Sequence, residues 1–439
     1  MLSDIHTTGG EQNALSRRGA TKASDFHNMM RFPLTIFKKM TSTMSAQKIP
    51  AKAASDPSLP PPVGQQDNDS LYFMPSEEEP HEGTWLQWPH NYGWDRYHVQ
   101  RYEESWIQMV AALCTGERVH VIVYNARQLR RVRSRLRQYH HHHCATAAAA
   151  ATATTVKMSQ IDFWVQPTDD VWIRDNGPIF VRDAKNGNNN NNNNNSLLIG
   201  NFMFNGWGKK AEYRHDNMVP VRVATGLELP RLDIPMVIEG GSFDVDGNGT
   251  LMAKKSSILN PNRNPGMTQA DAEALFRTYL GVTNFIWLEG ERDADVTDDH
   301  VDGTARFAGT NDNDTNNSTN NNTMIVTLYR EDFANPSEYD VLTKACNANG
   351  EPYTIVHLPT TSQPILDSGV EGTYVNYYVG NDVVLVPTYN DPMDQEALRI
   401  LGNVYPTRRV VGINMEQVHV DGGAVHCVTQ QQPAATSRR

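Results

Sequence analysis

Thr268-Gln-Ala-Asp-Ala-Glu-Ala-Leu-Phe-Arg-Thr-Tyr-Leu-Gly281 carries the signals of one complete helix. Its first threonine is expected to cap the helix, the aspartate three positions later completes a capping box, and the closing glycine ends the helix. The strand-like runs Thr250-Leu-Met-Ala253 and Asn284-Phe-Ile-Trp-Leu288 stand on either side of it. The order strand, helix, strand predicts one α/β unit.

Corresponding elements recur further along the chain. The run Pro336–Gly350 has a helical pattern and precedes the strand-like Tyr353–Leu358. A second helix is expected to start at Asp391, ahead of the strand-like Arg408–Ile413. The chain therefore repeats one α/β arrangement.

An acidic residue followed by small residues heads each repeat. Five such acids recur at intervals of about 54 to 65 residues: Asp175, Glu239, Asp302, Asp367 and Asp421. Repeats of this length are typical of solenoids and propellers. Because the acids occupy corresponding turns, a closed ring of five units would bring them together at one central mouth.

The composition limits the class of protein. The chain has 439 residues, of which 39% are apolar, so it can bury a large core in one domain or in two or three. No run approaches the roughly 20 apolar residues of a membrane span. The net charge of −11 favours small cationic ligands over nucleic acids, although many proteins are acidic for solubility alone.

The start of the chain differs in composition from the rest. Residues 1–70 are rich in small polar and basic residues and end in a proline-rich spacer, which predicts an N-terminal extension. Within it, Met29–Lys39 has the composition of a transit segment, although a disordered tail is the favoured interpretation. A folded domain is predicted for residues 71–433 and a tail for 434–439. We expect a cytoplasmic protein, with an organelle-targeted form as the alternative.

Three low-complexity inserts are expected to loop out of the domain, because they hold too few apolar residues to offset their chain entropy. They are His140–Thr155, the asparagine run that ends at Asn195, and Asn311–Thr323. For the four histidines of the first insert, a solvated tract is favoured over a metal site. The preceding Arg127–Arg137 predicts a surface helix, with nucleic-acid binding as the weaker alternative. The inward stripe of this helix is expected to be Leu129, Val132 and Leu136.

The four cysteines form no close pair and no metal-ligand spacing, so neither a disulfide framework nor a metal site is predicted. Cys114 and Cys346 are expected to be small buried side chains on helices, and Cys144 lies in an insert. Cys427 has reactive neighbours, in Asp421-Gly-Gly-Ala-Val-His-Cys-Val-Thr429. The residues after this cysteine resemble a strand, and its late position argues against a papain-like hydrolase.

Cys427 can act together with polar side chains from the other repeated turns. Its thiolate is a nucleophile, His300 can move protons, and two carboxylates can hold a planar guanidinium by charge-assisted hydrogen bonds. Those carboxylates are Asp175 and Asp302. Each acid alone could simply cap a turn, but their joint placement favours a shared site. A metal held by the two aspartates before His300 is the weaker alternative.

Six motifs resemble those of agmatine deiminases and bacterial-type peptidyl-arginine deiminases. In chain order they are Met74–Pro89, Val171–Pro178, Glu239–Ser242, Leu259–Pro265, His300–Asp302 and His426–Pro433. The resemblance therefore covers the predicted domain and omits the N-terminal extension. It implies a five-bladed α/β propeller of the guanidine-modifying (pentein) superfamily and an enzyme that needs no metal or organic cofactor.

The resemblance also implies roles for single residues. Cys427 would be the nucleophile, His300 the general acid and base, and Asp175 and Asp302 the carboxylates that hold the guanidinium. The residues expected to bind substrate are Glu239, Trp85, Trp88 and Trp172. The glutamate would contact the substrate or support the site, the first two tryptophans would line its aliphatic tail, and the third would stack on the guanidinium plane.

The implied reaction converts a guanidino group into a ureido group and releases ammonia. Cys427 attacks the guanidinium carbon, His300 protonates the departing nitrogen, and water hydrolyses the covalent intermediate. Neighbouring cations are expected to lower the pKa of the Cys427 thiol. The expected reaction is agmatine to N-carbamoylputrescine, in polyamine biosynthesis. Free or peptidyl arginine is the alternative substrate, and a non-catalytic binding propeller is a further alternative.

The chain departs from the agmatine deiminase pattern near the predicted site. Asp421-Gly-Gly-Ala stands where Gly-Gly-Gly-Asn is expected, and Asn205-Gly-Trp-Gly replaces Asn-Ala-Trp-Gly. The segment from Lys209 lacks the expected glycines. These differences leave recognition of the substrate tail open, and the sequence does not decide whether the chain forms a homo-oligomer.

Overall fold

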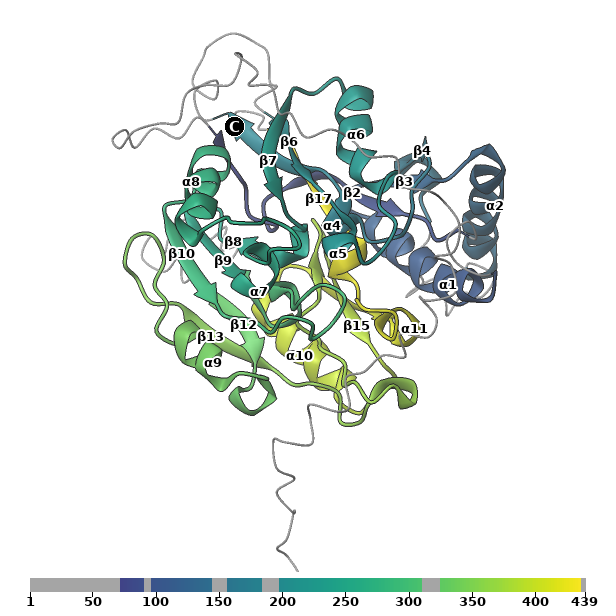
Figure 1. Cartoon of the computed structure of the whole chain (residues 1–439). Helices are drawn as coiled ribbons and strands as arrows, with labels where there is room; N and C mark the ends of the chain where they lie inside the picture. Colours follow the sequence, from purple (N-terminus) through teal and green to yellow (C-terminus); the bar gives the residue numbers. More distant parts are fainter. Residues whose placement is uncertain (1–71, 91–95, 144–155, 184–196, 310–323, 436–439) are drawn as a thin grey trace, which may run out of the picture. The chain divides into compact units, whose positions relative to one another are not determined.

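The computed structural model describes residues 72–90, 96–143, 156–183, 197–309 and 324–435. Within these ranges the strands form five β-sheets, connected by helices (Figure 1), so the predicted α/β fold is confirmed. The N-terminal extension with its transit-like segment lies outside the described residues. So do Cys144 and the two asparagine-rich inserts.

The five sheets share one pairing pattern among the described strands. In each sheet an antiparallel pair of strands is followed by a parallel pair. Parallel neighbours need a crossover connection, and a helix supplies it in every sheet. The repeat of strand, helix and strand is the physical basis of the regular spacing in the sequence.

The unit that contains the quoted helix illustrates the repeat. Its elements are β8 (Phe243–Val245), β9 (Thr250–Lys254), α7 (Lys255–Ile258), α8 (Gln269–Leu280) and β10 (Asn284–Leu288). The predicted capping box between Thr268 and Asp271 is present, and Gly281 ends the helix in a left-handed conformation with φ of 69°. Local sequence signals therefore determine both ends of α8.

The next two sheets follow the predicted order. Their elements are β11 (Ala305–Ala308), β12 (Met324–Leu328), α9 (Pro336–Leu342), β13 (Thr354–Leu358), β14 (Tyr378–Val379), β15 (Val383–Thr388), α10 (Asp394–Val404), β16 (Arg409–Asn414) and α11 (Glu416–His419). Helix α9 is shorter than predicted, because a bridge between Cys346 and Pro352 turns the chain after it. Cys346 is therefore exposed, and the prediction that it is buried was wrong.

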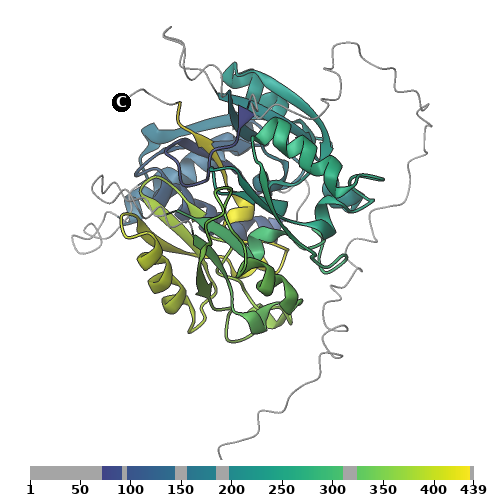
Figure 2. The ribbon, with the colours of Figure 1, turned by 90° about the vertical axis from the view of Figure 1, so that its left-hand side faces the viewer.

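The remaining two sheets join distant parts of the chain. Their elements are β1 (Tyr72–Phe73), α4 (Ile173–Asn176), β5 (Ile179–Asp183), β6 (Leu197–Met203), α5 (Gly206–Lys209), α6 (Val219–Leu227), β7 (Arg231–Val237), β2 (His81–Gln87), α1 (Arg96–Leu113), β3 (Arg118–Val123), α2 (Ala126–His143), β4 (Ile161–Val165) and β17 (Gln430–Pro433). Strand β17 pairs antiparallel with β2, so the C-terminal strand completes the sheet that the early strands begin (Figure 2).

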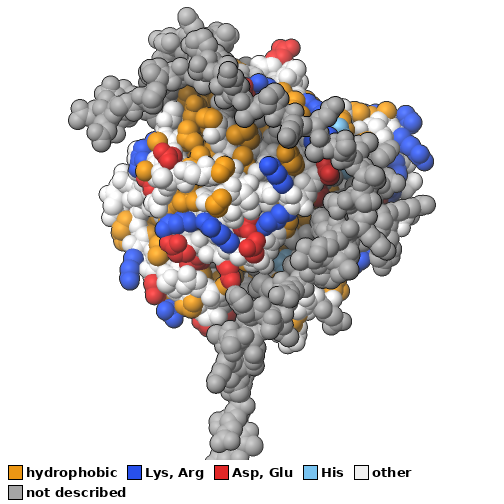
Figure 3. Space-filling model, viewed as in Figure 1, with side chains coloured by type: hydrophobic (Ala, Val, Ile, Leu, Met, Phe, Trp, Pro, Cys, Tyr) orange, Lys and Arg blue, Asp and Glu red, His pale blue; other side chains and the backbone are white. Residues whose placement is uncertain are grey.

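Helix α2 confirms the stripe predicted for the Arg-rich segment. Val132 and Leu136 are fully buried, and Leu129 packs partly buried beside them. The helix continues through His143, so the four histidines extend it instead of starting a loop. None of the described helices is both long and apolar enough to cross a bilayer. On the face shown in Figure 3, described acidic and basic side chains are interspersed.

Candidate active site

Short helical turns, each followed by a strand, carry the predicted reactive residues or directly follow them. Asp175 lies in α4, Glu239 just before a 3₁₀ turn that leads into β8, Asp302 in a turn before β11, and Cys427 in a turn before β17. The segment after Cys427 was predicted as strand, but β17 begins only at Gln430. Helix α4 contacts both the turn after Glu239 and the turn of Cys427, so equivalent parts of the repeat meet.

His300 is buried among three carboxylates. Its Nε2 lies 3.3 Å from Glu239 Oε2, and its Nδ1 lies 3.7 Å from Asp175 Oδ1. Burial opposes the charged imidazolium, but Asp175, Glu239 and Asp302 outweigh burial and raise the pKa of His300 to about 9. The imidazole is therefore protonated at neutral pH, as a general acid requires.

The Glu239 carboxylate is anchored from the opposite side by a buried arginine. Arg263 Nε donates to Glu239 Oε1 at 3.0 Å, and another nitrogen of the same guanidinium pairs with Asp298. Burial favours neutral Glu239, but the hydrogen bond from His300 and the charge of Arg263 lower its pKa. Glu239 thus contacts His300 and supports it from behind.

Asp175 accepts hydrogen bonds at both carboxylate oxygens. Trp207 Nε1 donates to Oδ2 at 2.9 Å, and the backbone N–H of Gly241 donates to Oδ1 at 3.1 Å. Burial raises the pKa of Asp175 to about 6, with His300 opposing the rise and Asp302 and Glu239 adding to it. The pH at which Asp175 loses its proton therefore lies only slightly below neutral, and above it the carboxylate is ionised.

Asp302 has a close imidazole partner in His426. Its Oδ2 lies 2.7 Å from His426 Nδ1. Burial favours the neutral acid, but the hydrogen bond and charge of His426, followed by the charges of His300 and Arg306, lower the pKa of Asp302. This carboxylate remains ionised at neutral pH.

The Cys427 thiol lies beside Asp302 in a buried turn. Its Sγ is 3.7 Å from Asp302 Oδ2 and 3.3 Å from the side-chain nitrogen of Asn376. The Asn376 oxygen accepts the backbone N–H of His426 at 3.0 Å, which fixes the turn. Burial, followed by the charges of Asp302 and Asp175, raises the pKa of Cys427 well above that of a free thiol. The prediction that neighbouring cations lower this pKa was wrong, because the charges that act most strongly on the sulfur are those of two carboxylates.

The side chains of His300, Asp175 and Asp302 come close together beside the backbone of Gly241. A Cβ at this position would lie 2.7 Å from His300 Nδ1 and 2.9 Å from both Asp175 Oδ1 and Asp302 Oδ2. Among the described groups, His300 Nδ1 has no hydrogen-bond partner. The His300 imidazole and two carboxylate oxygens thus lie close together at this point, and the carboxylate oxygens could accept hydrogen bonds from the N–H groups of a planar cation.

Sequence reasoning missed a buried network behind Asp302. Glu77 Oε2 lies 2.9 Å from His426 Nε2 and 2.9 Å from Arg174 Nη2, while its Oε1 lies 3.1 Å from Arg306 Nη2. Burial favours neutral Glu77, but Arg306, His426 and Arg174 lower its pKa well below the ordinary value. Glu77, Arg174 and His426 all lie within quoted motifs, and that membership was the signal that could have identified them.

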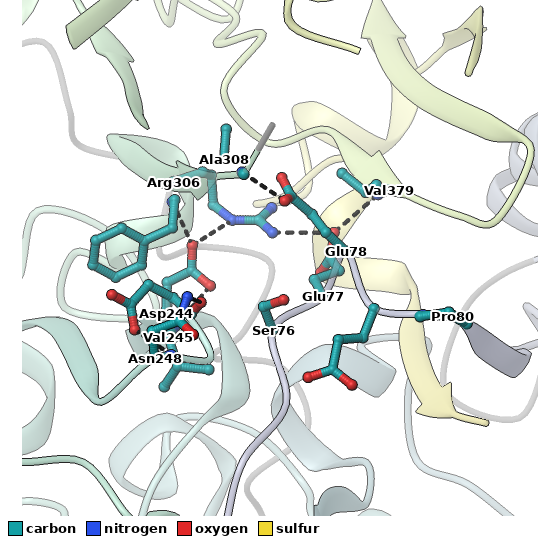
Figure 4. A pocket seen from close by; sticks show the side chains of 14 residues that line it. Ser76, Glu77, Glu78, Pro80, Asp244, Val245, Asn248, Arg306, Ala308 and Val379 are labelled. Carbon is teal, nitrogen blue, oxygen red and sulfur yellow. Dashed lines mark hydrogen bonds and ion pairs between the residues drawn. The ribbon is translucent and has the colours of Figure 1, made fainter. Parts of the chain in front are cut away.

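A pocket of about 210 Å³ lies against this network (Figure 4). Glu77, Glu78, Asp244 and Arg306 line it, and the guanidinium of Arg306 bridges the carboxylates of Asp244 and Glu77. The lining does not include Cys427. This pocket is therefore separate from the cluster of predicted catalytic residues.

Of the four residues expected to bind substrate, the three tryptophans lie in different surroundings. Trp85 and Trp88 are fully buried, with indole N–H groups donating to Gln432 and Glu103, and their contact with a substrate tail stays a prediction. Trp172 lies near Cys427. A Cβ at Gly423 would be 2.5 Å from the Trp172 ring and 3.0 Å from Cys427 Sγ, which makes ring and sulfur neighbours.

Of the other two acids of the repeat, only Asp421 has a described side chain, and its described contact lies outside the cluster. Asp421 accepts a hydrogen bond from Tyr102, and the side chain of Asp367 lies outside the described residues. The two aspartates before His300 pair with cations: Asp298 with Lys210 and Arg263, and Asp299 with Lys254. Their charges are thus compensated by protein cations, which disfavours the alternative of a metal bound there.

Comparison with known proteins identifies relatives over the described domain. A family model for Porphyromonas-type peptidyl-arginine deiminase matches residues 73–433. An agmatine deiminase from Stutzerimonas stutzeri is 31% identical over 399 residues, covering 83% of this chain and 96% of the relative.

Solved structures share the fold. The agmatine deiminase of Enterococcus faecalis has a TM-score of 0.67 and 24% identity, covering 85% of this chain and 99% of that chain. A C. jejuni agmatine deiminase with substrate bound has a TM-score of 0.64 and 21% identity, covering 85% of this chain and 100% of that one. The architecture and the relatives define a hydrolase that acts on carbon–nitrogen bonds. The chain belongs to the Porphyromonas-type peptidyl-arginine deiminase family.

Proposed function

We propose that the protein hydrolyses agmatine to N-carbamoylputrescine and ammonia. The observation that carries the proposal is the convergence of His300, Asp175 and Asp302 at the bare backbone of Gly241, with Cys427 Sγ 3.7 Å from Asp302 Oδ2. A relative that is 31% identical over nearly its whole length is named agmatine deiminase. The family name favours peptidyl arginine as the second candidate. Each of the four catalytic candidates is at least nine-tenths buried, which suits a thin linear amine better than a peptide.

The two carboxylates would bind the guanidinium before the thiol reacts. Asp302 is already ionised, and the incoming cation would stabilise ionised Asp175. The same positive charge would favour the Cys427 thiolate, so the thiol proton would leave as the cation arrives. The substrate would thus contribute positive charge that favours the thiolate.

The covalent steps then follow from the positions of sulfur and imidazole. The Cys427 thiolate forms a C–S bond with the guanidinium carbon, and the C–N bond to a terminal nitrogen breaks as His300 donates its proton. Ammonia leaves an S-alkylthiouronium. Neutral His300 then takes a proton from water, the hydroxide adds to the carbon, and the C–S bond breaks as the added hydroxyl group gives up its proton, which the released ammonia takes up as ammonium. The products are a urea and the thiolate, and His300 is again protonated.

Several broader predictions belong to the same proposal. The five sheets would be the blades of a pentein propeller, with the short turns of Asp175, Asp302 and Cys427 at its centre. The partner would be a small guanidino cation rather than nucleic acid or membrane, the location cytoplasmic, and a homo-oligomer stays an open alternative.

A product assay tests the reaction and its substrate. Ammonia and ureido product would be measured with agmatine, free arginine and an arginyl peptide, using Cys427→Ala as the blank. We expect the highest kcat/KM with agmatine. A higher value with arginine or the peptide would reassign the substrate, and turnover of none of the three would contradict the catalytic proposal.

A further inference from the structure

Helix α5 is an unusual turn. Its four residues, Gly206 to Lys209, have consecutive positive φ angles of 65°, 52°, 83° and 67°. The backbone N–H groups of Lys209 and Lys210 donate to the carbonyls of Asn205 and Gly206, both at 2.8 Å, so the segment is one turn of left-handed helix. This conformation is sterically unfavourable for residues with a Cβ, and two of the four, Trp207 and Lys209, carry one.

Neighbouring side chains hold this turn in place. Asn205 Oδ1 accepts the backbone N–H of Gly208 at 2.8 Å, and its side-chain nitrogen donates to the carbonyl of Asn262 at 2.9 Å. Lys210 pairs with Asp298 at 2.8 Å. Unfavourable backbone conformations persist where their surroundings determine them, and they concentrate at functional sites.

The turn directs one indole at a predicted catalytic carboxylate. Trp207 is buried, and its Nε1 donates to Asp175 Oδ2 at 2.9 Å. Its ring stands edge-on to Phe204, with centroids 5.2 Å apart and planes at 86°. Together with the backbone N–H of Gly241, the indole occupies both Asp175 oxygens with uncharged donors.

We propose that Trp207 is a positioning residue, and that the left-handed turn Gly206–Lys209 serves to hold its indole N–H on Asp175. The hydrogen bond keeps the carboxylate oriented toward the guanidinium and favours its ionised form without neutralising it. A cation at this place would compete with the substrate for Asp175, whereas an indole donor does not. The inference rests on the proposed function, because it assigns Asp175 to guanidinium binding.

Trp207→Phe isolates the hydrogen bond, because it keeps an aromatic ring against Phe204 and removes the donor. Trp287→Phe is the matched control, since the Trp287 indole donates to a carboxylate oxygen of Glu273 at 3.0 Å on α8. The rate would be measured as kcat/KM for agmatine from about pH 5 to 9. The titratable groups that face Asp175 are His300, Glu239, Asp302 and Cys427, and both variants retain them.

We expect Trp207→Phe to lower kcat/KM about tenfold or more at neutral pH, because a hydrogen bond to a charged group is lost. The acidic limb should move to higher pH, since Asp175 without the donor ionises less readily. Trp287→Phe should match the wild type in both respects. Equal acidic limbs in wild type and Trp207→Phe would overturn the proposal, as would an equal shift in Trp287→Phe.

A second measurement does not depend on turnover or on the folding of Trp207→Phe. In ¹⁵N-labelled wild-type protein, one indole N–H resonance should titrate with a midpoint near 6, the pKa of Asp175. This titration should vanish in Asp175→Asn. If one indole titrates but no guanidino substrate is turned over, the contact between Trp207 and Asp175 would be supported and the catalytic proposal would be contradicted. Absence of any such titrating indole would overturn the inference about Trp207.

Discussion

Asp302 and Asp175 stand in equivalent turns of the repeat, yet their surroundings give them opposite pKa shifts. Burial favours the neutral form of both. At Asp302 the hydrogen bond and charge of the adjacent His426, together with the charges of His300 and Arg306, outweigh burial and lower the pKa. At Asp175 the hydrogen-bond donors are uncharged, and burial raises the pKa to about 6 even though His300 opposes it. The repeat thus places two carboxylates together, and their neighbours decide which of them has a pKa close to neutral pH.

The largest expected effect removes the nucleophile that both carboxylates serve. Cys427→Ala should lower kcat at least about 10⁴-fold, because no other thiol lies in the described cluster. Both carboxylates remain in this variant, so it should still bind agmatine by calorimetry. Steady-state turnover close to that of the wild type would exclude the thiol mechanism.

The next test compares the two carboxylates directly in activity. Asp175→Asn and Asp302→Asn should each cost about 2–5 kcal/mol in transition-state stabilisation, since each removes one charge paired with the buried guanidinium. The measurement is kcat/KM for agmatine at neutral pH. A loss below about tenfold in either variant would show that its carboxylate does not hold the guanidinium.

The same two substitutions should change stability in opposite directions. The folded pKa of Asp175 lies above the unfolded value, so its ionised form destabilises the fold as pH rises through about 6, and Asp175→Asn should stabilise the protein at neutral pH. The folded pKa of Asp302 is lowered, so its ionised form contributes stability above the unfolded pKa, and Asp302→Asn should destabilise. Changes on the order of 1–3 kcal/mol are expected in the free energy of unfolding by urea. Shifts of the same sign would contradict the comparison.

A smaller effect is expected from replacing His426, the hydrogen-bond partner of Asp302. His426→Gln retains hydrogen-bonding capacity but removes the charge between Asp302 and Glu77. The pKa of Asp302 should rise, and kcat/KM should fall about 10- to 100-fold, the range of a lost charged hydrogen bond. The acidic limb of the pH–rate profile should broaden, because two carboxylates would then titrate near it. An unchanged limb would show that His426 does not control the charge of Asp302.

The sequence predicted the repeat and the four central residues, because each depends on local signals or on a motif. The capping box of α8 lies within four residues, and the acids recur at corresponding turns. The raised pKa of Cys427 could not be predicted, since it depends on burial and on anions that distant turns supply. Likewise, Trp85 and Trp88 share a motif with Glu77. The motif alone does not show that the two tryptophans pack in the buried interior while Glu77 joins the ion-pair network.

The pH dependence of the wild type sharpens the comparison without any substitution. Asp175 must be ionised to bind the guanidinium, so kcat/KM should fall as pH drops below about 6. His300 must carry its proton to release ammonia, so kcat/KM should also fall above about 9. The check is the rate with agmatine across this range in a buffer of constant ionic strength. A profile that stays flat through pH 6 would mean that Asp175 is ionised well below that pH and behaves like Asp302.

The smallest effect is expected from removal of residues 1–60, which leaves both carboxylates and all their described partners in place. The first described partner of the site is Glu77, and strand β1 begins at Tyr72, so the deletion spares every contact of the network. We expect kcat/KM within about twofold of the full chain and the same acidic limb, because terminal segments outside a core are generally dispensable. Loss of folded protein would show that the extension belongs to the domain. If the truncated protein folds and is active but its acidic limb is shifted, a charged group of residues 1–60 must act on Asp175. The opposite pKa shifts of Asp175 and Asp302 would then depend on that extension as well as on the repeat.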